Sequence, residues 1–308
     1  MTPDATAPTL RPLGVGDIVD RTIGLYRASP QLFLVLAALP YVVLAIASLI
    51  LNFAFVRSTP LSTLPTDLFD PRDPTTLRTS FSPEQVTGLV TFGVVVGIIG
   101  LLVLSVQAAA LVDAMAKRYL GQPATLAGSL RAGLRASVRL ILASVVAFVV
   151  FVLVLTIAIL LLAVAGVALR NPIPVIIGVI AVFVLIFYVI ASLMPVPAVV
   201  TLEGRGPIDG LRRSWQLAGG ARWRILGLLT LMTILQTILG VLFAFVFLGT
   251  IASEGPIKTV LQEVANLAVN ALWAPIQWGV FTLLYYDLRV RKEAFDLQLA
   301  AESIPRAT

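Results

Sequence analysis

Arginine is the residue type in this chain with the most potential for chemistry, because the sequence contains neither His nor Cys. That composition excludes disulfides, Cys or His metal ligands, thiol nucleophiles and the usual proton shuttle at neutral pH. We therefore expect no enzyme activity, no metal and no cofactor. The arginines gather in short segments where they could bind anionic groups. The candidates are Arg131, Arg135, Arg212, Arg213, Arg222 and Arg224.

Three interpretations of these arginines stay open. They could only fix the orientation of membrane helices, bind an anionic lipid or phosphorylated ligand, or dock a protein partner. The densest group is interleaved with Trp215 and Trp223, and Trp favours the boundary between membrane and water. Nucleic acid is not expected as a partner, because charges that set membrane orientation already explain the pI of about 10.1.

A second set of polar side chains falls inside long apolar stretches. Asn266, Asn270 and Gln277 lie at helical spacing and share one face, and Gln236 lies in the preceding stretch. Such amides either hydrogen-bond between packed helices or line a polar pathway. The interiors of these stretches carry no Asp, Glu, Lys or Arg, so proton-coupled transport is not expected. The glycines at positions 93, 97 and 100 form a small-residue stripe that predicts close helix packing.

The apolar stretches predict the fold. The chain is 58% hydrophobic and 12% charged, far from the composition of a soluble domain. Six stretches reach the roughly 20 apolar residues that a membrane-spanning helix needs. They cover residues 32–56, 86–112, 140–169, 175–202, 225–248 and 264–286. The sequence thus predicts an all-α, polytopic membrane helix bundle, with residues 1–308 in a single membrane domain.

The distribution of Lys and Arg predicts the orientation of these helices. The N-terminal segment, the C-terminal segment 287–308 and the two connections between them on the same side together hold 17 of the 22 basic residues. The other three connections, including the loop 57–85, hold 5. Because basic residues favour the cytoplasmic side, we expect both termini in the cytoplasm and the loop 57–85 outside.

The cytoplasmic segments repeat a pattern. Before each odd-numbered span, apolar residues at helical spacing alternate with charged residues, around residues 15–27, 126–139 and 207–216. Basic amphipathic helices of this kind lie in the membrane interface. We therefore predict three interfacial helices and a pseudo-threefold repeat, in which each unit is an interfacial helix followed by a helical hairpin.

Three segments resemble the bacterial glycerophosphoryl diester phosphodiesterase membrane domain family. They are LRPLGVGDIVDRTIGLYRASPQLFLVLAALP from Leu10, GPIDGLRRSWQLAGGARWRILGLL from Gly206 and TLLYYDLRVRKEAFDLQL from Thr282. In that family such a membrane domain can be fused to a metal-dependent phosphodiesterase barrel, which this chain lacks. The resemblance implies a multi-pass protein of the bacterial plasma membrane with a role linked to lipids or the cell envelope.

The charged positions shared with that family predict ion pairs at the cytoplasmic face. These positions are Asp17, Asp20, Arg21, Asp287 and Arg289. We expect some of them to join the N-terminal helix to the end of the sixth span.

Two functions remain in view. The first is a non-enzymatic scaffold or accessory protein that engages anionic lipids or a protein partner at the cytoplasmic face. The alternative is a permease or a transporter of lipids or small solutes, of the facilitator type, whose pathway would contain the amide stripe.

Overall fold

The computed structural model describes residues 11–51, 83–169, 172–246 and 256–302. Nearly all of these residues are helical, and no strand occurs among them. Six helices are long and apolar enough to cross a membrane, as the hydropathy pattern predicts. The expected external loop 57–85 lies outside the described residues, except for its last three residues, which begin a helix.

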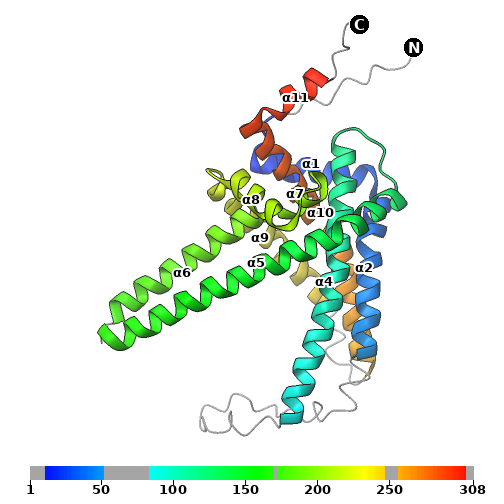
Figure 1. Ribbon diagram of the computed structural model, residues 1–308. Coiled ribbons are helices and arrows are strands. Elements are labelled where there is room, and N and C mark those ends of the chain that lie inside the picture. The colour runs from blue at the N-terminus through cyan, green and yellow to red at the C-terminus, as the bar shows by residue number, and fades with distance from the viewer. Residues whose placement is uncertain (1–10, 52–82, 170–171, 247–255, 303–308) are drawn as a thin grey trace, which may run out of the picture.

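Ten helices lie within the described residues (Figure 1). In chain order they are α1 (Val15–Ala28), α2 (Pro30–Leu51), α4 (Pro83–Tyr119), α5 (Leu126–Leu169), α6 (Pro172–Leu193), α7 (Val196–Leu202), α8 (Pro207–Ala218), α9 (Arg222–Val246), α10 (Pro256–Glu293) and α11 (Phe295–Glu302).

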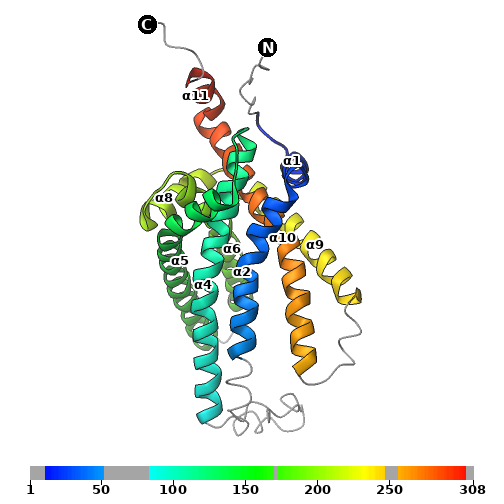
Figure 2. The same ribbon diagram turned by 90° about the vertical axis from the view of Figure 1, so that its right-hand side faces the viewer.

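One end of the molecule holds most of the charge and most of the packed core. We call it the charged end; it consists of α1, α7, α8, the starts of α5 and α9 and the last turns of α4 and α10. Both termini of the described chain lie there (Figures 1 and 2). The buried apolar core sits at the same end and includes nearly every residue of α10 from Val280 to Leu288.

Helices α2, α4 and α10 run side by side from the charged end to the opposite end (Figure 2). The fully buried Gln107 side chain on α4 donates a hydrogen bond of 2.8 Å to the Ala37 carbonyl oxygen on α2. Because an amide in an apolar environment needs a partner, this bond fixes the two helices against each other. Gln107 thus connects packed helices, which is the structural role expected of amides inside the spans.

The hairpin of α5 and α6 diverges from this bundle (Figure 1). The two helices pack against each other, but none of the residues in the most apolar stretch of either helix is buried. Helix α9 likewise separates from α10 as it leaves the charged end (Figure 2). Tight packing among the described helices is therefore concentrated at the charged end.

Two elements differ from the sequence-based expectation. The segment 126–139, expected as a separate interfacial helix, is the first part of α5, a continuous helix of 44 residues. At 1.5 Å per residue its length is about 66 Å, roughly twice the hydrocarbon thickness. The fourth span, expected over 175–202, is divided: α6 ends at Leu193 and α7 begins after Pro195. Proline lacks the N–H that would continue the first helix.

At two glycines near the charged end, neighbouring helices approach closely. A Cβ atom at Gly133 of α5 would lie 2.6 Å from the Val106 carbonyl oxygen of α4, and one at Gly279 of α10 would lie 2.5 Å from the Thr22 side chain of α1. The expected glycine stripe on α4 does not play this role, because a Cβ at Gly93, Gly97 or Gly100 would meet nothing described within 4 Å.

Candidate functional site at the charged end

The carboxylate of Asp287 ties three parts of the chain together. Its fully buried side chain accepts a hydrogen bond of 2.7 Å from the Leu13 backbone N–H. It forms ion pairs with Arg224 of α9 and with Arg291, whose Nε lies 3.1 Å from each carboxylate oxygen. Both arginines also donate to the Leu13 carbonyl oxygen, Arg291 over 2.9 Å. The N-terminal segment, α9 and α10 thus share one cluster, the Asp287 joint.

The charged residues of α1 take no part in this joint. Asp17 accepts a hydrogen bond of 2.9 Å from the Gly14 N–H at the start of its own helix, and Asp20 is exposed. Arg21 lies beside Tyr119 of α4. Arg289 pairs with Glu293 one turn further along α10, at 3.1 Å. The N-terminal segment is therefore joined to the end of α10 through the Leu13 main chain.

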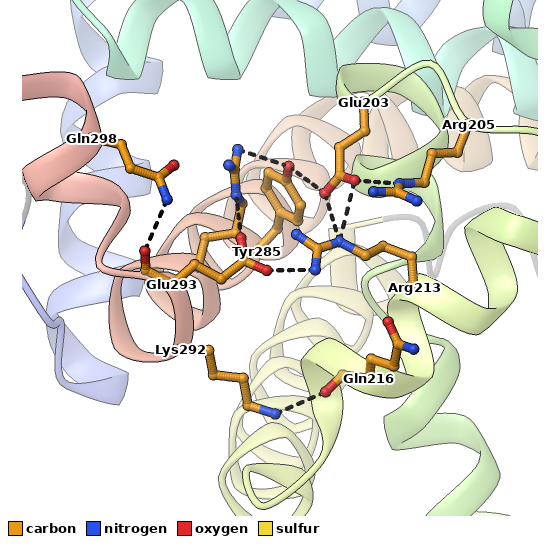
Figure 3. Close-up of polar contacts among 9 residues, drawn as sticks. Glu203, Arg205, Arg213, Gln216, Tyr285, Lys292, Glu293 and Gln298 are labelled. Carbon is orange, nitrogen blue, oxygen red and sulfur yellow. Dashed lines mark hydrogen bonds and ion pairs between the residues drawn. The ribbon is translucent and has the colours of Figure 1, made fainter. Parts of the chain in front are cut away.

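A second cluster surrounds Glu203 at the end of α7 (Figure 3). Its carboxylate accepts hydrogen bonds from Arg205 Nε at 2.6 Å, from Arg213 Nε at 3.2 Å and from the Tyr285 hydroxyl at 3.0 Å. Arg213 of α8 also pairs with Glu293 of α10. This cluster, the Glu203 joint, connects α7, α8 and α10.

The electrostatics of the Glu203 joint favour its charged form. Burial by itself raises the pKa of Glu203, but the hydrogen bonds and positive charge of Arg205 and Arg213 outweigh it, so the net pKa lies below its ordinary value. The hydrogen bond to Glu293 holds the pKa of Arg213 above its ordinary value. Both groups are therefore ionised at neutral pH, and their charges compensate each other.

Arg222, the first residue of α9, is held by aromatic rings instead of a carboxylate. Its guanidinium carbon lies 4.1 Å from the ring centre of Tyr188 on α6 and 5.3 Å from that of Trp215 on α8. Its Nε donates a hydrogen bond of 2.8 Å to the Ser192 hydroxyl. Arg222 forms no ion pair with any described residue, so its charge has a fixed position and no compensating anion.

The remaining predicted arginines are exposed. Arg131 and Arg135 on α5 and Arg212 on α8 make no ion pair with the described residues. They lie among exposed apolar side chains. Leu134 and Val138 of α5 are each 62% exposed, and Ile208 and Trp215 share the exposed face of α8 with Arg212. The six arginines therefore divide into Arg213 and Arg224, which have carboxylate partners, and four that have none among the described residues.

The amide stripe is spread over partly exposed positions. Gln236 on α9 and Asn266 on α10 are exposed, and Gln277 is half-buried. Asn270 donates a hydrogen bond of 2.8 Å to the Asn266 carbonyl oxygen of its own helix. No hydrogen bond among the described residues connects Gln236 to the α10 stripe. The four amides thus form no polar network between α9 and α10 in this part of the chain.

Two grooves flank α6 near the charged end. One has a volume of about 440 Å³ and lies among α5, α6 and α8, with Arg212 and Trp215 beside Val154 and Val189. The other, about 470 Å³, lies between Val184, Phe187 and Tyr188 of α6 and Arg222, Trp223 and Leu226 of α9. We call the second one the α6–α9 groove. Neither groove is lined by the amide stripe.

Several residues of the Asp287 and Glu203 joints were not predicted from the sequence. Glu203, Tyr285 and Glu293 had no predicted role, although Glu203 carried a signal: it is the first acidic residue after Asp113. A single carboxylate that follows a long uncharged stretch and stands among arginines favours an ion pair. The part played by the Leu13 main chain had no such signal, because every residue has the same backbone groups.

Comparison with known proteins gives a family match over most of the chain. The model of a family described as a domain of unknown function (DUF7847) matches residues 13–288. The match begins at Leu13 and ends one residue after Asp287, so it contains the central contact of the Asp287 joint. No curated protein and no solved structure matches the chain.

Proposed function

The chain belongs to the DUF7847 family, whose function is unknown, and from its charged end we propose that it is a non-enzymatic integral membrane protein that binds anionic lipid headgroups. It acts as a scaffold or accessory protein at the membrane surface. The observation that carries this proposal is the set of exposed arginines without carboxylate partners, Arg131, Arg135 and Arg212, set among exposed apolar side chains.

The physical argument rests on the mixed character of these faces. Exposed Leu, Ile, Val and Trp side chains favour the acyl region, while arginines at the same level favour anionic headgroups. Each basic residue near an anionic membrane surface contributes about 1 kcal/mol of attraction. A protein partner would also be attracted by Trp and Arg. The lipid assignment is favoured because these faces of α5 and α8 continue into the apolar surface of the α5–α6 hairpin.

The proposal includes an orientation and a location. Both termini lie on the cytoplasmic side of a bacterial plasma membrane, as the Lys and Arg distribution and the resemblance to the phosphodiesterase membrane domain family predict. In this arrangement α1 and α8 lie in the membrane interface. The first part of α5 takes the place of the middle interfacial helix. The threefold pattern is kept in the sequence, but in the second unit the interfacial segment and the span form one continuous helix.

Lipid retention by charge variants tests the proposal. The full chain is reconstituted in nanodiscs of phosphatidylglycerol and phosphatidylcholine, and the bound lipids are counted after extraction. We expect enrichment of phosphatidylglycerol that falls as salt rises, because exposed charges are screened. The triple variant R131Q/R135Q/R212Q should lose most of this enrichment.

A matched pair of single variants separates these contacts from net charge. R212Q and R205Q each remove one positive charge from α8 or the segment before it, but Arg205 is paired with Glu203. We expect R212Q to lower the enrichment more than R205Q. Equal enrichment in the wild type and the triple variant would contradict the proposal.

A further inference from the structure

Arg222 has the geometry of a prepared anion receptor. The rings of Tyr188 and Trp215 and the Ser192 hydroxyl fix its guanidinium group. Because Nε donates to Ser192, the two terminal nitrogens keep their N–H donors, and these have no hydrogen-bond partner among the described residues. A planar guanidinium with free paired donors matches the geometry of a phosphate group.

The backbone around Arg222 favours the same ligand charge. Arg222 begins α9, whose first turn leaves N–H groups without helical partners and carries the positive end of the helix dipole. The neighbouring Lys292 ammonium donates a hydrogen bond of 2.8 Å to the Gln216 carbonyl oxygen at the end of α8, so a second cation lies close to the α8–α9 connection. No described carboxylate pairs with either cation.

The α6–α9 groove next to Arg222 is lined mainly by apolar side chains. Val184 and Phe187 of α6 and Leu226 of α9 line the same groove as Arg222. Its volume of about 470 Å³ falls in the range of small-molecule sites. Trp223, 85% exposed beside Arg222, has the position that Trp favours at the level of lipid headgroups.

We propose that the α6–α9 groove binds one anionic glycerophospholipid, with its phosphate on Arg222 and an acyl chain between α6 and α9. The apolar part of the groove favours a lipid as the ligand. A free phosphate has no acyl chain that could pack against Val184, Phe187 and Leu226. This inference specifies the class of lipid that the protein binds, and it rests on the proposed lipid-binding function. It differs from the surface of Arg131, Arg135 and Arg212 in holding a single lipid at a fixed position.

Native mass spectrometry of the purified full chain tests the site with phosphatidylglycerol as the probe. R222Q removes the phosphate contact, and V184F fills the apolar part of the groove while leaving Arg222 in place. Val184 is 58% exposed, so the larger ring has room without disturbing the helix packing. R212Q is the matched control, because it removes one charge from the other groove.

We expect the wild type and R212Q to retain one phosphatidylglycerol at high salt, where surface attraction is screened. R222Q and V184F should each lower this retention about tenfold, the effect of losing a charged hydrogen bond or an equivalent apolar contact. Retention in both variants equal to that of the wild type would overturn the site. Displacement of the lipid by millimolar inorganic phosphate would overturn the acyl-chain assignment.

The same measurements separate this site from the proposed function. If R131Q/R135Q/R212Q loses lipid enrichment in nanodiscs while R222Q and V184F keep the tightly held lipid, the site is wrong and the surface proposal stands. If the wild type shows no preference for phosphatidylglycerol over phosphatidylcholine in nanodiscs and retains no phosphatidylglycerol in native mass spectrometry, both are wrong.

Discussion

At the scale of single residues, two carboxylates organise the charged end in different ways. Asp287 is fully buried and holds a main-chain segment as well as two arginines, so its own charge depends on these partners for compensation. Glu203 is partly accessible and is compensated by arginines from the α7–α8 connection and α8. Loss of the first carboxylate should therefore affect the fold more than loss of the second.

The substitution D287N tests the Asp287 joint. It leaves Arg224 and Arg291 without a compensating charge, and we expect the free energy of unfolding to fall by about 3 kcal/mol. D113N is a suitable control, because part-buried Asp113 pairs with Lys117 over one turn of the same helix, and such helical pairs contribute about 0.5 kcal/mol. Thermal unfolding in detergent measures both variants, and equal midpoints for them would count against this joint.

The Glu203 joint predicts a pH dependence. Because the pKa of Glu203 is lowered in the folded chain, its ionisation stabilises the fold above its ordinary pKa, and this stabilisation is lost as pH falls through the folded value. E203Q lacks this contribution at every pH. We expect the wild type to unfold at a higher temperature than E203Q at pH 7, with a smaller difference at pH 3. A difference that is the same at both pH values would mean that the charge of Glu203 is not involved.

At the scale of helices, backbone contact decides where a side chain can be added. G133A places a Cβ against the Val106 carbonyl oxygen, which cannot move without displacing α4, so we expect a loss of about 1–3 kcal/mol in stability. G97A adds the same methyl group where nothing lies within 4 Å and should leave stability unchanged or slightly raised. The difference in thermal midpoint between the two variants measures this contact. Similar midpoints would show that α4 and α5 do not touch at Gly133.

The helices were more predictable from the sequence than their contacts. Uninterrupted apolar stretches identified all six spans, and the fourth is divided between α6 and α7 at Pro195. No comparable signal separated residues 126–139 from the third span, because no proline follows Leu126 until Pro172 and the helical spacing of leucines runs on. The glycine stripe of α4 resembled a packing face, yet the close contact falls at Gly133, since the partner helix decides which face is covered.

The candidate site was predictable in composition and not in pairing. The arginines of the charged end were identifiable from their clustering. Which of them are compensated depends on Glu203, Asp287 and Glu293, and the longest separation between an arginine and its partner, from Arg213 to Glu293, is 80 residues. Only folding brings these partners together, so sequence spacing within a helix could not reveal them.

At the scale of the whole molecule, the even number of spans requires the two ends of the described chain to lie on the same side. Accessibility labelling of single cysteines tests the proposed orientation, because the chain has none of its own. We expect A127C, exposed at the charged end, to react only after the membrane is permeabilised, and V86C at the opposite end to react from outside. The reverse pattern would contradict a cytoplasmic charged end.

Because α5 and α6 diverge from the bundle, the thickness of the bilayer contributes to their tilt. The hairpin is held at the charged end, where the first part of α5 packs against α4, and its apolar stretches contain no buried residue. A helix longer than the hydrocarbon layer adjusts by tilting until its apolar length is covered. In a thinner membrane we therefore expect the hairpin to tilt further from the membrane normal, while its end beside Arg212 and Arg222 stays at the charged end.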